Sequence, residues 1–163
     1  MTKSILTISG SGRTQSSNRI LLKTIQNRYP MIDFFSSDIL FKLPVFQDGL
    51  STISDIVIEW KQAVASCDAV LISTPEYIGG VPSVIKNAFE WLAESGELNN
   101  KHVIPITLTP HAPRGKQTEQ ALNWILKALG AKVEASLLLH LNEIGDVEHP
   151  NDTTLELLDE LLS

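Results

Sequence analysis

The feature that most constrains this fold is a regular alternation of short apolar segments and longer amphipathic segments along the chain. The apolar segments have the composition of buried strands, and the amphipathic segments repeat apolar residues at helical spacing. The expected strands are residues 3–9, 31–35, 69–73, 102–108 and 132–139. The expected helices are residues 17–28, 54–66, 82–92 and 117–129, and a final helix that runs to Leu162 with Asp152 or Thr153 as its cap.

Strict alternation of strand and helix predicts an α/β fold, in which a parallel sheet is covered by helices on both faces through right-handed crossovers. Pro105 interrupts the fourth expected strand and indicates a bulge or another local irregularity there. Ligands of such sheets bind beyond the carboxyl ends of the strands. The loops after the first, third and fourth strands, residues 9–18, 74–82 and 109–116, are therefore expected to converge on one crevice.

The loop at residues 9–18 carries four serines, a threonine, an asparagine and an arginine between a strand and a helix. Hydroxyls, backbone N–H groups and the positive end of a helix together favour an anion of phosphate size. The dinucleotide fingerprint fails because Gln15 stands where its third glycine is needed, and no Gly-Lys-Ser/Thr closes a nucleoside-triphosphate loop. A serine-rich turn in which Ser16 or Ser17 only caps the helix is the structural alternative.

Length and composition narrow the function classes. A chain of 163 residues is expected to form one domain over residues 1–163. The formal net charge of −6 argues against nucleic-acid binding, which needs a basic surface. The single cysteine, Cys67, excludes an intramolecular disulfide and a cysteine-based zinc cluster, and no metal-ligand spacing is present. Without a membrane-spanning apolar run or a signal peptide, we expect a cytoplasmic protein that binds no membrane.

The loops and the segments beside them resemble the NADPH-dependent FMN reductase family of flavodoxin-like proteins, which includes quinone, azo-dye and chromate reductases. The pattern Gly10-Ser11-x-Arg13-x-x-Ser16-x-Asn18 is similar to the flavin-phosphate motif of that family. The segment from Thr74-Pro75-Glu76-Tyr77 to Pro82, with Lys86-Asn87-Ala88 and Glu90-Trp91, is similar to its second motif. Leu43-Pro44-x-Phe46, with Asp48 nearby, resembles a weaker third element.

The resemblance implies a flavodoxin-like three-layer sandwich whose five parallel strands have the order 2-1-3-4-5. It implies FMN as cofactor, with NADPH or NADH as hydride donor. The phosphate would be bound by Ser11, Arg13, Ser16, Ser17 and Asn18. The isoalloxazine ring would lie along Pro75, Glu76, Tyr77, Ile78 and Gly79, where Gly79 and Gly80 let the backbone approach it.

The activity implied by the resemblance is a ping-pong transfer of hydride from NAD(P)H through flavin N5 to a small-molecule acceptor such as a quinone, azo compound, flavin or metal ion. The protein would supply binding and electrostatics and no catalytic side chain. It would be a homodimer or homotetramer. The segment from Thr109 to Gly115 departs from the serine- and glycine-rich loop typical of the family. A flavodoxin-like electron carrier and a non-catalytic module are the alternatives.

Overall fold

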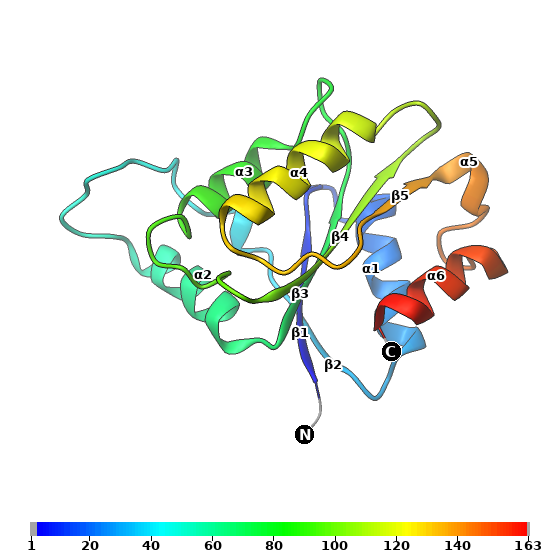
Figure 1. Ribbon diagram of the computed structural model, residues 1–163, viewed down its shortest axis with the longest axis horizontal. Coiled ribbons are helices and arrows are strands. Elements are labelled where there is room, and N and C mark those ends of the chain that lie inside the picture. Colours follow the sequence, from blue (N-terminus) through cyan, green and yellow to red (C-terminus); the bar gives the residue numbers. More distant parts are fainter. Residues whose placement is uncertain (1–2, 163) are drawn as a thin grey trace.

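The computed structural model describes residues 3–162. Its centre is a five-stranded parallel sheet with the order β2-β1-β3-β4-β5, which confirms the predicted topology (Figure 1). The strands are β1 (Ser4–Ser9), β2 (Asp33–Ser36), β3 (Ala69–Thr74), β4 (His102–Thr109) and β5 (Leu137–His140). The helices are α1 (Ser17–Arg28), the short 3-10 helix η1 (Ile39–Phe41), α2 (Asp55–Ser66), α3 (Ser83–Glu90), α4 (Lys116–Ala128), α5 (Leu141–Ile144) and α6 (Asp152–Leu162).

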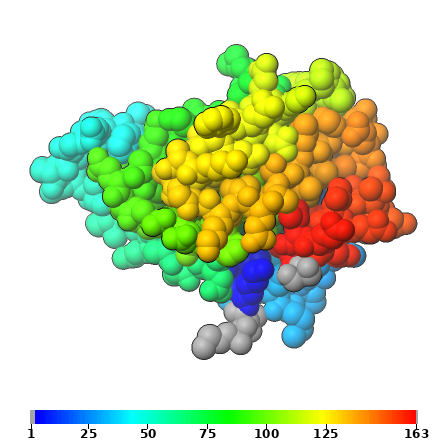
Figure 2. All heavy atoms as spheres, in the orientation of Figure 1, coloured from blue at the N-terminus to red at the C-terminus, as the bar shows by residue number. Residues whose placement is uncertain are grey.

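Alternate residues of the inner strands supply two separate hydrophobic cores, one on each face of the sheet. In β1, Leu6 and Ile8 belong to the core under α2, α3 and α4, whereas Ile5 belongs to the core under α1, α5 and α6. In β3, Val70 and Leu71 divide between the two cores in the same way. Figure 1 shows the helices on the two sides of the sheet, and in Figures 1 and 2 the orange segment around β5 lies between α4 (yellow) and α6 (red).

The irregularity expected at Pro105 is not found in β4, where Pro105 pairs in register with Ile72 of β3. It is found instead in the neighbouring strand β5. Residue 105 faces the same side as Val103, whose N–H donates to Lys132 O on the β5 side at 2.9 Å. Proline has no N–H to offer there, and β5 begins only at Leu137 after an isolated bridge at Lys132. The prediction of a strand over residues 132–139 was therefore too long at its start.

Other differences are local. η1 and α5 were not predicted, because each is too short to show a helical period. Asn151 caps α6 in place of the expected Asp152 or Thr153, since its Oδ1 accepts a hydrogen bond from Thr154 N at 3.0 Å. Ser16 is the N-cap of α1, as one of the two expected alternatives, and accepts from Arg19 N at 3.3 Å. Among the described residues, no helix is long and apolar enough to cross a membrane.

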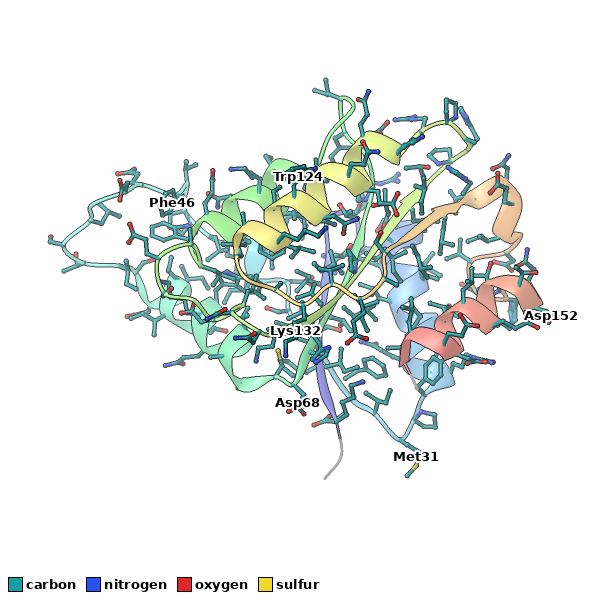
Figure 3. The ribbon with its side chains drawn as sticks, in the orientation of Figure 1. Met31, Phe46, Asp68, Trp124, Lys132 and Asp152 are labelled. Atoms are coloured by element: carbon teal, nitrogen blue, oxygen red, sulfur yellow. The ribbon has the colours of Figure 1, made fainter. Side chains whose placement is uncertain are left out.

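The segment between η1 and α2 is held against α3 by polar groups of the second motif. The carboxamide of Asn87 accepts from Phe46 N at 2.8 Å and donates to Pro44 O at 3.0 Å. The Trp91 indole N–H also donates to Pro44 O, at 2.9 Å, and the Phe46 ring packs edge-on against Trp91. Figure 3 shows Phe46 beside α3. Asn87 and Trp91 therefore stabilise the fold and do not line the pocket between the three loops.

We expect Asn87→Ala to lower the free energy of unfolding by about 1–3 kcal/mol, because two hydrogen bonds to the backbone at Pro44 and Phe46 are lost. Urea unfolding monitored by tryptophan fluorescence measures the change. The matched control on the same helix is Lys86→Ala, which removes only an exposed ion pair with Glu90 and should change stability by less than about 0.5 kcal/mol. Equal effects of the two substitutions would contradict this role of Asn87.

Candidate functional site

The three loops expected to converge do so. Loop 9–18, loop 74–82 and loop 109–116 line one pocket of about 240 Å³ at the carboxyl edge of the sheet. Eight of the residues expected to bind a cofactor line it, namely Ser11, Arg13, Ser16, Ser17, Asn18, Pro75, Glu76 and Tyr77. The rest of its wall is formed by Leu108, Pro110, Arg114 and Leu141.

The first loop gathers hydrogen-bond donors that have no acceptor within residues 3–162. Ser11 is 1% exposed, and its hydroxyl lacks any hydrogen-bond partner in that part of the chain. Asn18 uses its Oδ1 to accept from Ser73 Oγ at 2.8 Å, which leaves its amide nitrogen as a donor. The N–H groups of Ser17 and Asn18 are in the first turn of α1, where no intrahelical acceptor exists. Such a cluster of donors is suited to an anion.

Two arginines and a glycine determine the charge and the position of the first loop. Arg13 is an exposed pocket residue with no ion pair to any described residue. Arg19 holds the loop in place, because its Nε donates to Ser11 O at 3.1 Å while its Nη1 lies 2.6 Å from Asp38. A Cβ at Gly10 would lie 2.4 Å from Thr74 Oγ1, so only glycine lets the first loop approach the second.

The second loop ends in a tight hairpin that projects beyond the sheet, at the top of Figure 1. Tyr77 and Gly80 exchange two backbone hydrogen bonds of 3.0 Å across a two-residue turn. The turn residues Ile78 and Gly79 have φ of 50° and 71°, and the Ile78 side chain is fully exposed. Neither lines the pocket, so their place beside a flavin ring stays a prediction. For Gly79 the structure supplies a second reason for glycine, the left-handed turn.

Glu76 joins the second loop to the third. Its carboxylate accepts from Gly115 N at 2.8 Å and Thr118 Oγ1 at 3.2 Å, and lies 3.4 Å from Arg114 Nε. Its side chain is 11% exposed. Burial alone raises the pKa of a carboxyl group, but these hydrogen bonds and the nearby guanidinium outweigh it and hold the pKa of Glu76 below its ordinary 4.5. Glu76 is therefore an anionic tether between the loops.

The backbone of the third loop is also held by side chains at the ends of β4 and β5. The carbonyl of Arg114 accepts from Thr109 Oγ1 at 3.2 Å and from His140 Nε2 at 3.0 Å. Gly115 has φ of 95°, and a Cβ there would lie 2.5 Å from the Leu138 side chain. His111 of this loop does not line the pocket, and within the described part of the chain its imidazole ring bonds only to Ala112 O, at 3.0 Å.

The sequence indicated the loops better than the individual side chains. Leu141 was missed because it opens the short helix α5, which carried no periodic signal. Arg19 was missed because its contacts with Ser11 and Asp38 depend on the packing of α1 against the segment after β2. Arg114 lies in a loop expected at the crevice, but nothing in its local sequence indicated that it enters the pocket.

The fold and the position of the pocket define a flavodoxin-like α/β protein. Solved structures agree: the flavoenzyme NAD(P)H:acceptor oxidoreductase FerB from Paracoccus denitrificans matches 98% of this chain and 92% of its own, with a TM-score of 0.83 at 24% identity. General stress protein 14 from Treponema denticola, solved in complex with FMN, matches with a TM-score of 0.67 at 14% identity, over 98% of this chain and 99% of its own.

The chain belongs to the NADPH-dependent FMN reductase family, whose model matches residues 4–146. A 2-hydroxy-1,4-benzoquinone reductase from Burkholderia sp is 34% identical over 92 residues, which are 56% of this chain and 50% of that protein. The NADH-dependent flavin reductase subunit 2 from Lactobacillus johnsonii is 30% identical over 95 residues, 58% of this chain and 51% of that protein. The chain thus spans about half the length of these relatives.

Glu76 should make stability depend on pH. Because the pKa of Glu76 is lower in the folded state than its ordinary 4.5, its carboxylate stabilises the fold above that value and loses the effect as the pH falls through the folded-state pKa. The stability difference between wild type and Glu76→Gln should therefore be largest at neutral pH and shrink in acid. Urea unfolding from neutral pH down to about pH 3 measures it.

The exposed Glu94 provides the control. Glu94→Gln should leave the pH profile of the wild type unchanged. A Glu76→Gln protein whose profile runs parallel to that of the wild type would show that the loop tether does not depend on the charge of Glu76.

Proposed function

We propose that residues 1–163 form a single FMN-binding domain that acts as an NAD(P)H-dependent oxidoreductase. The observation that carries this proposal is the buried Ser11 hydroxyl, which has no partner within residues 3–162, beside Arg13, which forms no ion pair there, at the amino end of α1. An orphaned buried hydroxyl is unfavourable without a ligand, and a dianionic phosphate can accept from several donors at once. The donor set therefore fits the phosphate of FMN.

The assignment of groups follows from this fit. Ser11, Ser16, Asn18 and the N–H of Ser17 would bind the phosphate with Arg13 as counter-ion. Pro75 and Tyr77 would form an apolar wall for the ring, as flat heterocycles require. Ile78 and Gly79 would lie at its edge on the projecting hairpin.

The protein supplies binding, orientation and shielding from water. When bound, FMN supplies the hydride chemistry between NAD(P)H and an acceptor. Glu76 holds the second and third loops together and is already saturated by donors, so we assign it no proton transfer. Leu108, Pro110 and Leu141 would contribute apolar wall that excludes water from the pocket. We assign no catalytic side chain and no metal.

The acceptor class is a quinone or a related small electron acceptor. The relatives named as a 2-hydroxy-1,4-benzoquinone reductase and a flavin reductase subunit support this choice. Azo compounds and metal ions are the other acceptors we include. We expect donor and acceptor to use the same side of the pocket in turn, which gives ping-pong kinetics. A flavodoxin-like carrier would bind FMN without turnover, and a non-catalytic module would do neither.

We also propose a homodimer or homotetramer in the cytoplasm, where NAD(P)H is available. A pocket of about 240 Å³ falls below the roughly 300–1,000 Å³ of typical ligand sites, so a second subunit would complete the cover of the ring. The exposed side chains of Tyr77 and Ile78 beside it are suited to such a contact. A monomer in sedimentation at micromolar concentration would contradict the oligomer, and recovery in the membrane fraction would contradict the location.

FMN affinity tests the phosphate site. Arg13→Gln removes a charge-assisted hydrogen bond and should weaken FMN binding by about 1.5–3 kcal/mol, or roughly tenfold to a hundredfold. Quenching of flavin fluorescence measures the affinity. Riboflavin lacks the phosphate, so its affinity should be the same for Arg13→Gln and wild type.

Lys23→Gln is the matched control, because it removes one positive charge from α1 outside this pocket. It should bind FMN as the wild type does. An equal loss for FMN and riboflavin in Arg13→Gln, or no loss at all, would remove Arg13 from the phosphate site.

Steady-state kinetics test the activity. The FMN-loaded protein should oxidise NADPH or NADH when 1,4-benzoquinone is added, and double-reciprocal plots at several quinone concentrations should be parallel. Intersecting lines would contradict the shared site. Bound FMN without NAD(P)H oxidation would indicate the electron carrier, and no saturable FMN binding would indicate the non-catalytic module.

A further inference from the structure

The pocket contains a second cation that FMN phosphate binding does not explain. Arg13 enters from the first loop and Arg114 from the third, and both line the pocket. The phosphate donors gather at the amino end of α1, on the first loop. Besides Arg114, the lining includes the apolar residues Leu108, Pro110 and Leu141 and the Glu76 carboxylate, which lies 3.4 Å from Arg114 Nε. A guanidinium with donors left over from such a contact suits an anionic ligand.

Arg114 is held by its backbone, which leaves most of its side chain available. Its carbonyl takes hydrogen bonds from Thr109 and His140, and its N–H donates to His111 O at 3.2 Å. Only Nε of the guanidinium has a partner in the described part of the chain, Glu76 Oε1 at 3.4 Å. The two terminal nitrogens have none there, and the side chain is 45% exposed.

Glu76 orients this guanidinium and does not saturate it. The shorter contacts of the Glu76 carboxylate are to Gly115 N and Thr118 Oγ1, at 2.8 and 3.2 Å. Arg114 thus presents a planar pair of donors whose geometry matches a carboxylate, sulfonate, enolate or phosphate group. The oxidised flavin ring is uncharged, and its phosphate would be bound by the other loop, so oxidised FMN offers Arg114 no anion. The reduced ring, which is anionic, would be affected equally with every substrate, and the experiment below separates it from an anionic substrate.

We propose that Arg114 binds an anionic group of the substrate that enters beside the flavin, and so selects anionic over neutral substrates. The inference rests on the function proposed above. Two sources share this chemistry: the 2′-phosphate that distinguishes NADPH from NADH, and an acidic substituent on the electron acceptor. Arg114 acts here as a specificity determinant, separate from the hydride transfer itself.

Arg114→Gln tests the proposal through paired substrates. NADPH is compared with NADH, and 1,2-naphthoquinone-4-sulfonate with 1,2-naphthoquinone. The substitution should lower kcat/KM roughly tenfold or more for the member of at least one pair that carries the additional anionic group, the 2′-phosphate or the sulfonate. It should lower kcat/KM by less than about twofold for the member that lacks this group. A loss confined to NADPH identifies the 2′-phosphate as the anion, a loss confined to the sulfonate identifies the acceptor, and both losses together assign both. An equal loss for all four substrates, or none, would overturn the proposal, and an equal loss would place Arg114 at the flavin itself.

Two further variants separate charge from loop structure. Lys116→Gln removes a neighbouring positive charge outside the pocket. It should leave unchanged the ratio of kcat/KM between the two members of each substrate pair. Arg114→Lys keeps the charge and should retain part of the preference, which a purely structural role of Arg114 would not produce. If Arg114→Gln fails to fold, Arg114→Lys and Lys116→Gln still test the proposal. Substrate preferences that are fully kept in Arg114→Lys but lost in Lys116→Gln would contradict it.

A binding measurement keeps this inference distinct from the activity. Calorimetry with the FMN-loaded protein compares naphthalene-2-sulfonate with 2-naphthalenemethanol, neither of which can be reduced. If the acceptor carries the anion, wild type should prefer the sulfonate, and Arg114→Gln should lose that preference while its FMN affinity stays unchanged. Wild type that turns over neutral quinones but prefers neither the sulfonate here nor NADPH over NADH in the kinetics would overturn this inference alone. Wild type that binds no FMN would overturn the proposed function instead.

Discussion

The site depends on the fact that all five strands end at the same edge of the sheet, where their loops must pack against one another. Two contacts make this packing specific. Gly10 allows the first loop to touch Thr74 at the base of the second, and Glu76 accepts hydrogen bonds from the third loop and the start of α4. Within the described part of the chain, donors of the first loop stay unpaired, and the surrounding packing holds them in place. The anion-binding pocket that we propose therefore depends on loop packing as much as on loop composition.

Much of the fold could be predicted because its signals are local. Strands buried on both faces and helices with an apolar stripe are visible over five to ten residues, and their strict alternation leaves few topologies. The start of β5 could not be predicted, because it depends on the missing N–H of Pro105 in the adjacent strand. The N-cap of α6 could not be predicted either, because several adjacent polar residues could accept a hydrogen bond from the first turn, and Asn151 is the one that accepts from Thr154 N. The first is a tertiary effect, and the second is a local choice among adjacent polar residues.

The candidate site divides in the same way. Ser11, Ser16 and Asn18 could be predicted to line the pocket because donors cluster in one short loop before a helix. Arg114 and Leu141 reach the pocket only through long-range contacts of the third loop and β5. Asn87 and Trp91 belong to the second motif as much as Pro75 and Tyr77 do, yet they anchor the segment at Pro44. One motif thus contains residues that line the pocket and residues that stabilise the scaffold.

The backbone anchoring of residue 114 has an evolutionary consequence. Thr109 and His140 bind its carbonyl oxygen, a group that every amino acid carries. The loop can therefore keep its conformation when the side chain at this position is exchanged. Related proteins could diversify what they accept by a single replacement there, with the scaffold and the first loop inherited intact.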